Sequence, residues 1–499
     1  MTNIAKVNIL DEVNVSVTNL KGEHNKHFVD KYALFAANYF FNPKFKMGRW
    51  DGKIQHFSKA GRTFLYLLPE ILRELAKMGY KIELKDLRTA NLVQPQNITE
   101  DIFSDYFHPD TGQPIILRDY QVNAVNKLLF DGNGICLACT GSGKTLSCAA
   151  LLTAYTPYNL KTITIVPDQN LIIQTIKTYN LVGLDCGEYS GTRKTLDHQH
   201  IVSTWQALQY NTYLMNSFDL VIVDEAHGLT GPVVRSIVCD HAVHMPYRFG
   251  FTGTLPKEPI DELSVKIAVG QVKYNIEAKT LIERGILAKL DIECVQLIEN
   301  VQEEYEQYLS ELTHTQLQES YAKFKAGYFP EYSAEKSWLQ HNDDRIQWIA
   351  DRIMLEHKQY GNVLCFIGSI PMSRKIASLI PGAIIVNGED VKNPKKRQKF
   401  YDLFETNDDV IMLATPNIAG TGLSINRIFV LMAVDLGKSF VRVIQAIGRG
   451  LRTSHDKKSV RFVDISSDFK FGKQHLTTRL KYYKDASYPY TIKKITYKH

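Results

Sequence analysis

The run Thr-Gly-Ser-Gly-Lys-Thr has the composition of a loop that binds phosphate groups. Its two glycines let the backbone curl so that successive N–H groups point inward and form a cradle for an anion. Lys144 supplies a cation for the β- and γ-phosphates, and Thr145 offers a hydroxyl to Mg²⁺ at the start of a helix. We therefore predict that a nucleoside triphosphate and Mg²⁺ bind at Thr140, Gly141, Ser142, Gly143, Lys144 and Thr145.

Asp224 and Glu225 are adjacent carboxylates at the end of the apolar, β-branched segment 218–223. Two such groups at a strand end divide naturally between two tasks. Asp224 is predicted to orient Mg²⁺, and Glu225 to polarise the water that attacks the γ-phosphate. The alternative is an Asp-Glu pair on a surface turn, which the apolar run directly before it disfavours.

Gln121 lies on an amphipathic helix predicted from Leu117 through Phe130. A glutamine amide can both donate to and accept from the edge of an adenine, so Gln121 would select ATP among the triphosphates. Without the phosphate loop downstream, an exposed polar helix residue would be the simpler interpretation.

Arg449 and Arg452 stand one helical turn apart, on the same face of a predicted helix. Guanidinium groups suit the planar charge that develops during phosphoryl transfer. The part of the chain that contains them has no phosphate loop of its own. We predict that both arginines reach the γ-phosphate of a nucleotide held by the first lobe; surface salt bridging is the alternative.

Buried strands that alternate with helices must position these residues. The segments 134–139, 162–166 and 218–223 have the apolar, β-branched composition of strands in a parallel sheet, and a second strand-and-helix series begins at residue 363. Ligands sit at the carboxyl ends of such strands. Gln174 follows the strand at 162–166, and Thr204 lies where another strand ends, at 202–206, so both are predicted to contact a DNA backbone.

The stretch from Lys44 to Arg62 combines cations with aromatic rings. It contains six basic residues against the single acid Asp51. Exposed cations and rings suit a phosphate backbone and unstacked bases. A twisted hairpin that turns at Asp51-Gly52 and carries solvated lysines is the alternative. With a nucleotide site downstream we predict DNA contact, through Lys44, Lys46, Arg49, Trp50 and Lys53.

Composition excludes several other classes. The chain of 499 residues is 44% hydrophobic and 22% charged, as in an ordinary globular protein, and its net charge of +6 is modest. Seven cysteines without a framework spacing indicate a reducing compartment. Cys136 and Cys139 form a C-x-x-C pair that we interpret as packing residues. Since neither a signal peptide nor a membrane-length apolar run is apparent, we expect a cytoplasmic protein without a membrane partner.

The order of these motifs resembles that of superfamily 2 helicases. Gln121, the Gly-Ser-Gly-Lys-Thr loop, Asp-Glu-Ala-His, Thr-Gly-Thr at 252–254, Gly-Thr-Gly at 420–422 and Gln-x-x-Gly-Arg-x-x-Arg span about residues 115–465. The resemblance implies two RecA-like lobes with ATP between them and nucleic acid across both. It assigns Thr421 to DNA contact and Gly422 to the nucleotide. RNA helicases usually carry Ser-Ala-Thr as the third motif, so Thr-Gly-Thr looks more like the DNA-directed branch.

The N-terminal segment is similar to the opening domain of phage UvsW-type recombination helicases, through Phe-Asn-Pro-Lys-Phe at 41–45, Gly48 and Trp-Asp-Gly-Lys at 50–53. This resemblance implies a DNA helicase for branch migration and fork regression in phage replication, recombination and repair, moving 3′ to 5′. In that setting the cytoplasm would be that of the host. We expect a monomer that meets other replication or recombination proteins.

The expected fold is α/β, with two tandem RecA-like parallel-sheet lobes and a small N-terminal α+β domain. The predicted domains are a DNA-recognition domain (1–110), lobe 1 (111–287), a helical transition region (288–345), lobe 2 (346–468) and a basic tail (469–499). A polar linker near 91–112 is predicted between the first two. Three other functions stay open: a double-strand translocase that does not separate strands, an ATP-gated clamp on DNA junctions, and an RNA helicase.

Overall fold

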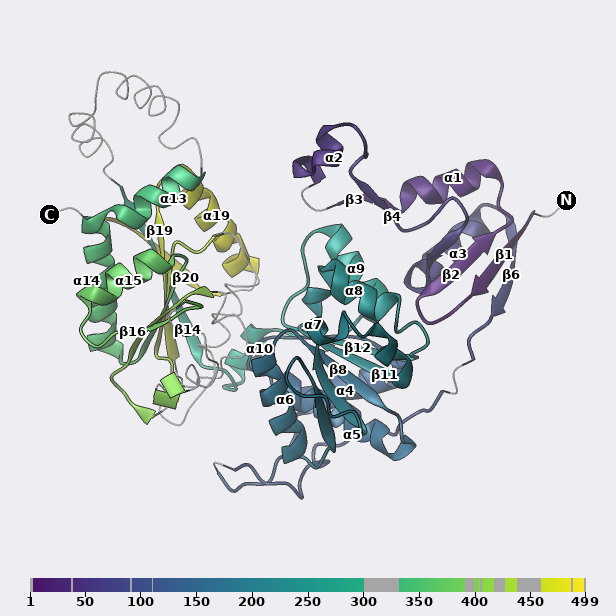
Figure 1. Ribbon diagram of the computed structural model, residues 1–499, viewed down its shortest axis with the longest axis horizontal. Helices are drawn as coiled ribbons and strands as arrows, with labels where there is room; N and C mark the ends of the chain where they lie inside the picture. Colours follow the sequence, from purple (N-terminus) through teal and green to yellow (C-terminus); the bar gives the residue numbers. More distant parts are fainter. Residues whose placement is uncertain are drawn as a thin grey trace. The chain divides into compact units, whose positions relative to one another are not determined.

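The computed structural model describes residues 3–36, 39–89, 92–109, 111–299, 332–389, 391, 399–400, 402–403, 406–416, 427–437, 459–485 and 488–497. The chain divides into two compact units, one comprising residues 1–139 and 143–276 and the other residues 140–142 and 277–499. The first unit contains a small N-terminal domain and lobe 1, and the second contains lobe 2 (Figure 1). No described helix is long and apolar enough to cross a membrane.

The N-terminal domain has the α+β class that was predicted. Its four-stranded sheet has the order β5-β2-β1-β6, in which β1 is antiparallel to β2 and parallel to β6. Alternate residues of β1 and β2 face a core that also holds Phe28 of α1 and Ile71 of α3, so both helices cover the same face. The elements are β1 (Asn3–Ile9), β2 (Asn14–Thr18), α1 (Gly22–Lys31), β5 (Arg62–Phe64), α3 (Leu68–Lys77) and β6 (Tyr80–Asp86).

A two-stranded ribbon, β3 (Ala33–Phe35) and β4 (Lys53–Gln55), extends from this domain and carries the basic stretch. We call residues 33–55 the arm. A hairpin turning at Asp51-Gly52 is wrong, because Ala36 N–H donates to Gly52 O at 2.8 Å and so the ribbon is still paired there. The connection instead contains a 3₁₀ turn, Tyr39–Phe41, and the short helix α2 (Pro43–Lys46).

Lobe 1 is built on a parallel sheet of seven strands in the order β13-β7-β12-β11-β8-β10-β9. Helices on both faces bury the strands, which explains their continuous apolar runs. Because β12 lies between β7 and β11, the motifs that follow these three strands come to one edge of the sheet. The strands are β7 (Asn133–Ala138), β8 (Thr162–Val166), β9 (Cys186–Tyr189), β10 (His200–Thr204), β11 (Leu220–Asp224), β12 (Tyr247–Thr252) and β13 (Val272–Ile276). The helices are α4 (Asp119–Asp131), α5 (Lys144–Tyr155), α6 (Gln169–Leu181), α7 (Trp205–Leu208), α8 (Pro232–Cys239) and α9 (Pro259–Val269).

The polar stretch that was predicted to be a linker packs along lobe 1. The Tyr247 hydroxyl donates to Val93 O at 2.9 Å, and the Asn126 side chain exchanges two hydrogen bonds with the backbone of Ile98. Ile98 and Phe103 are buried. The polar and proline-rich composition concealed these anchors, because only a few apolar residues hold the segment in place.

Lobe 2 has a second parallel sheet, in the order β16-β17-β15-β18-β19-β14-β20. The sheet extends beyond residues 346–468. Strand β14 comes from the predicted helical transition region, and β20 from the predicted basic tail. The elements are α10 (Ala278–Glu283), β14 (Lys289–Ile298), α13 (Tyr332–His341), α14 (Asp343–Tyr360), β15 (Val363–Ile367), α15 (Ile370–Leu379), β16 (Ile384–Val386), β17 (Ile411–Ala414), β18 (Val430–Val434), β19 (Ser459–Ser467), α19 (Lys470–Asp485) and β20 (Tyr490–Thr496).

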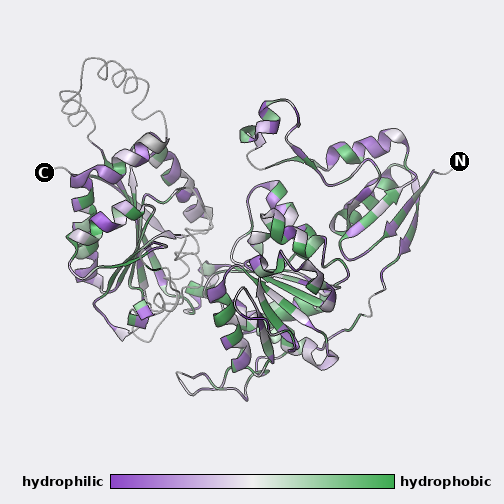
Figure 2. Ribbon diagram, in the orientation of Figure 1, coloured by the Kyte–Doolittle hydropathy of each residue, from purple (hydrophilic) through white to green (hydrophobic). Residues whose placement is uncertain are grey.

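Hydrophobic residues gather along the strands of both lobes, whereas the helices are mixed in character (Figure 2). The two cores are separate clusters, each formed by strand residues and the inner faces of the flanking helices. Each sheet is therefore the centre of its own hydrophobic core, as expected for tandem α/β lobes.

One prediction concerns His200, which is 1% exposed at the start of β10. Its Nδ1 lies 2.8 Å from Thr162 Oγ1, and burial lowers its pKa to about 4 although Asp185 opposes the shift. The pKa of this histidine in the unfolded chain is about 6.5. At a pH between about 6.5 and 4, the unfolded chain therefore binds a proton that the folded chain does not. Stability is therefore lost as the pH falls.

For this histidine we expect a loss of roughly 2 kcal/mol between pH 7 and pH 5, and His200→Gln should lose correspondingly less. Urea unfolding at the two pH values measures the difference. Equal pH dependence in the wild type and the variant would contradict the assignment.

Candidate nucleotide site and nucleic-acid surfaces

The predicted phosphate loop joins the end of β7 to the start of α5. Gly141 and Gly143 both have φ of +85°, a left-handed conformation that side chains disfavour. A Cβ on Gly143 would also lie 2.5 Å from Gln121 Nε2. Glycine is thus required at 143 by both backbone conformation and space. The loop leads directly into α5, whose first residue is Lys144.

The carboxylates of Asp224 and Glu225 lie at the same edge of the sheet as the phosphate loop, two strands away. Asp224 ends β11 and is 9% exposed, and its Oδ1 accepts a hydrogen bond from Glu225 N–H at 2.9 Å. Glu225 has φ of +52°, which is uncommon for a residue with a side chain and is typical of functional positions. This backbone conformation turns the chain sharply as it leaves the strand.

Lys144 and the two carboxylates form a largely buried cluster of charges. Lys144 Nζ lies 3.8 Å from Glu225 Oε1 and donates to Ala138 O at 3.4 Å. Burial alone would lower the pKa of Lys144, but Glu225 and Asp224 raise it above its usual value. Burial and the adjacent Glu225 raise the pKa of Asp224 to about 6, against the opposing effect of Lys144. The cluster therefore brings together the cation and the carboxylates that the sequence predicted.

His227 extends this cluster and was missed as a site residue. Its Nδ1 lies 3.3 Å from Glu225 Oε2 and 3.0 Å from Thr252 Oγ1, and the Thr252 hydroxyl donates to Thr254 O. A continuous chain of contacts thus runs from Lys144 to the Thr-Gly-Thr turn. The signal in the sequence was the fourth residue of Asp-Glu-Ala-His, which was assigned no role.

Gln121 is 3% exposed and lies against the phosphate loop. Its Nε2 donates to Gly143 O at 3.2 Å, and its Oε1 accepts from Arg118 N–H at 2.9 Å. The amide thus connects the start of α4 to the loop. Selection of adenine by this residue stays a prediction.

The residues at this edge fit a triphosphate with Mg²⁺. Hydroxyl and carboxylate oxygens, as supplied by Thr145 and Asp224, are the ligands that Mg²⁺ prefers. The α5 N-terminus favours an anion, and Asp224 is a buried carboxylate that a cation would stabilise. The cysteines nearby are not suited to metal binding, because burial raises the pKa of Cys136 to about 12 and of Cys139 to about 11. Among the residues that the structure describes, no cluster of His, Cys, Asp or Glu could hold a metal by itself.

The predicted DNA-binding residues of unit 1 lie in two places. Gln174 is on α6, and Thr204 is a largely buried residue at the carboxyl end of β10. In the arm, Lys44, Lys46 and Arg49 are exposed. The other two arm residues are partly held: the Trp50 indole donates to Lys53 O at 2.9 Å, and Lys53 Nζ lies 5.1 Å from the centre of the Phe35 ring. Phe40 and Phe41, 50% and 66% exposed, add rings to this surface.

Four predicted site residues lie outside the described residues: Thr421, Gly422, Arg449 and Arg452. Their roles stay predictions.

Two family models match the chain. Residues 8–85 match the N-terminal domain of the DNA helicase UvsW, and residues 114–257 match the res subunit of type III restriction enzymes. The first match lies within the predicted N-terminal domain, and the second covers the phosphate loop and the Asp-Glu-Ala-His motif.

Similar proteins include known helicases. The chain is 23% identical to the ATP-dependent DNA helicase uvsW of Enterobacteria phage T4, over 91% of this chain and 89% of that protein. It is 24% identical to the protein named "Putative helicase 22" of Sulfolobus islandicus filamentous virus, over 70% of this chain and 64% of that protein. Among solved structures, the restriction-modification enzyme LlaBIII bound to DNA aligns with a TM-score of 0.57 at 14% identity, over 86% of this chain and 36% of that one, which is a likeness of fold.

The two parallel sheets, the candidate nucleotide site on the first of them and the two family matches support a superfamily 2 helicase. The chain is of the UvsW-like type, and its residues 8–85, which precede the two lobes in the sequence, match the UvsW N-terminal domain.

Proposed function

We propose that this protein is an ATP- and Mg²⁺-dependent DNA helicase that remodels branched DNA, by branch migration and fork regression, in phage replication, recombination and repair. Its substrate would be forked or junction DNA, and its direction 3′ to 5′. We propose that it works as a monomer in the host cytoplasm. The observation that carries the ATP-dependent part is the chain of contacts from Lys144 through Glu225 and His227 to Thr252.

Glu225 is the proposed general base for the attacking water, because its carboxylate lies between a lysine and a histidine at a strand end. Thr145 and Asp224 would hold Mg²⁺, which would neutralise charge on the phosphates. Arg449 and Arg452 are proposed to stabilise the transferred phosphoryl group. If the lobes grip the DNA backbone alternately through the ATP cycle, each turnover becomes a step along one strand.

The arm is proposed to recognise the branch. Replacing Lys44, Lys46, Arg49 and Lys53 by glutamine should weaken binding to forks and junctions and reduce the salt slope of log K by about 0.9 for each phosphate that the arm no longer neutralises. Binding is measured by fluorescence anisotropy over a series of salt concentrations, with strand displacement measured on the same substrates.

A matched control replaces four exposed lysines elsewhere in the N-terminal domain: Lys6, Lys77, Lys81 and Lys85. These changes alter the net charge equally, so they should leave the preference for branched substrates intact. The proposal for the arm fails if both quadruple variants behave alike.

A double-strand translocase that does not separate strands is the second candidate, and the match to the type III restriction res subunit favours it. ATPase rates with single strand, blunt duplex, fork and four-way junction discriminate the two. Strong stimulation and released strands on forks and junctions support the helicase. Equal stimulation by blunt duplex without a displaced strand supports the translocase.

A further inference from the structure

A group of exposed tyrosines and cations lies on lobe 1, and the sequence analysis assigned none of its members a function. Tyr210 and Tyr213 are 82% and 66% exposed, and the Arg193 side chain is 75% exposed. Lys194 is exposed as well. We call these four residues the lobe 1 aromatic patch. A surface that combines exposed rings with cations is of the kind that marks an interaction site.

Local contacts hold the two halves of the patch together. Arg193 and Lys194 lie in a turn that directly follows β9, closed by a hydrogen bond from Ser190 N–H to Arg193 O and by the bridge between Tyr189 and Lys194. Burial and the nearby Tyr213 hydroxyl raise the pKa of Tyr189, while a side-chain hydrogen bond with Asn211 opposes the shift. Tyr189 thus contacts both the basic turn and the segment after α7, in which Tyr210 lies in a turn and Tyr213 in the 3₁₀ helix Thr212–Ser217.

Within the described part of the chain, Arg193 has no close carboxylate partner, because the nearest one, Glu188, accepts hydrogen bonds from other residues. Glu188 is 8% exposed, and its Oε1 accepts hydrogen bonds from Gln169 at 2.7 Å and from the Ser190 hydroxyl at 2.6 Å. Arg193 Nη1 is 4.0 Å from the other oxygen, Oε2, which is the limit of an ion pair. Such a contact in a mostly exposed arginine contributes little, so Arg193 is available to an external anion.

The patch stands at the carboxyl ends of β9 and β10, on the same edge of the sheet as the nucleotide motifs. Strands β8 and β11 separate β10 from β12 in the sheet order, so the patch is at the far end of that edge. Ligands of parallel sheets bind at the carboxyl edge. Because the patch lies at the far end of this edge, it can hold a ligand other than the nucleotide.

We propose that the lobe 1 aromatic patch binds single-stranded nucleic acid, with bases stacked on Tyr210 and Tyr213 and phosphates paired with Arg193 and Lys194. Rings stack on unpaired bases, whereas the bases of a duplex already stack on each other. Guanidinium and ammonium groups beside the rings match a phosphate backbone in charge. The inference deepens the proposed function and rests on it: the patch would hold the unpaired strand of a branched substrate.

The test compares a labelled single strand with an abasic strand of the same length and a blunt duplex, using fluorescence anisotropy on the full chain. Combined Tyr210→Ala and Tyr213→Ala should weaken binding of the single strand at least about tenfold, since a stacked base contributes roughly 1–3 kcal/mol. Combined Tyr210→Phe and Tyr213→Phe should retain binding, because the rings remain. The abasic strand and the duplex should bind both tyrosine variants as they bind the wild type.

Arg193→Gln with Lys194→Gln should reduce the salt slope for the single strand by about 0.7 for each phosphate that is no longer neutralised. Phe130→Ala is the control, because it removes another exposed ring, 78% exposed, on the α4 side of the same lobe. Wild-type binding of the single strand by the alanine variant would overturn the inference, and so would an equal loss for the abasic strand.

The result that would refute the proposed function differs from the result that would refute the patch. If no DNA stimulates ATP turnover in the wild type, the helicase proposal is lost. If stimulation persists while the tyrosine variants bind as the wild type does, only the patch is lost.

Discussion

Glu225→Gln is expected to reduce ATP turnover by about 10²–10⁴-fold while ATP binding persists. The amide has nearly the shape of the carboxylate, so it can stay between Lys144 and His227. It cannot accept a proton from the attacking water, however. The chemical step should therefore be lost without loss of the site. Single-turnover hydrolysis and binding of a fluorescent ATP analogue measure the two effects separately.

Asp219→Asn is a suitable control for Glu225→Gln. Asp219 precedes the same strand, β11, at its opposite end, and its Oδ2 accepts a hydrogen bond from Lys161 N–H at 2.9 Å. It is far along the strand from the nucleotide edge, so turnover should be close to that of the wild type. Normal turnover in the Glu225 variant would remove Glu225 from the role of base.

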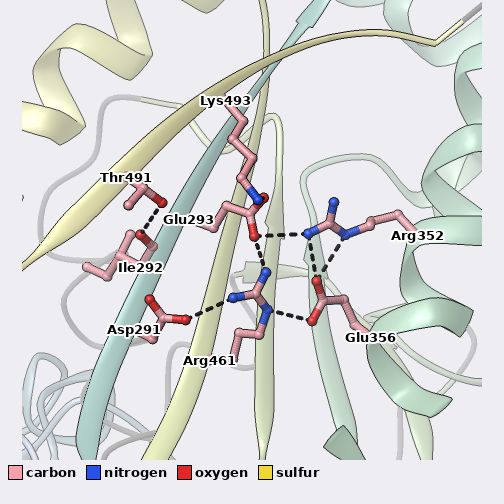
Figure 3. Close-up of polar contacts among 8 residues, drawn as sticks. All are labelled: Asp291, Ile292, Glu293, Arg352, Glu356, Arg461, Thr491 and Lys493. Carbon is pink, nitrogen blue, oxygen red and sulfur yellow. Dashed lines mark hydrogen bonds and ion pairs between the residues drawn. The ribbon is translucent and has the colours of Figure 1, made fainter. Parts of the chain in front are cut away.

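Glu293→Ala is expected to destabilise lobe 2 by about 3 kcal/mol. Glu293 is 2% exposed on β14 and pairs with Arg461 of β19, with Arg352 of α14 at 3.1 Å and with Lys493 of β20 at 3.0 Å (Figure 3). Its pKa is lowered because these three cations together outweigh the effect of burial. Without this carboxylate, partly buried cations lose their shared partner.

The loss should be local to the elements that Glu293 connects. Amide hydrogen exchange followed by mass spectrometry should show faster exchange in β14, β19 and α14, while the strands of lobe 1 exchange at wild-type rates. Unchanged exchange in lobe 2 would contradict the prediction.

Asp291→Asn is the matched control for this network. Asp291 lies on the same strand and contacts the same Arg461 at 2.8 Å, but its side chain is 67% exposed. An ion pair open to water contributes little. The variant should therefore unfold within about 1 kcal/mol of the wild type.

Local sequence determined the nucleotide motifs and the class of fold. The conformation of Gly141 and Gly143, the helix that begins at Lys144 and the apolar strand before Asp224 follow from neighbouring residues alone. Parallel strands buried on both faces leave a continuous apolar signal, and a glycine-rich turn before a helix leaves another. For this reason the sequence alone was enough to predict that Lys144 and the two carboxylates share one site.

Contacts between distant segments were decided only by the tertiary structure. The participation of His227 depends on the position of β12, because Thr252 comes to it from a neighbouring strand. Strands β14 and β20 join the sheet of lobe 2 from segments whose charged residues resemble a solvated connector and tail. Strand β20 lies at the edge of the sheet, where exposed lysines are tolerated and no apolar run is required. Strand β14 lies inside the sheet, but its charged residues, such as Glu293 with its ion pairs, interrupt the apolar pattern. The lobe 1 aromatic patch likewise exists only because folding brings the turn after β9 beside the segment after α7.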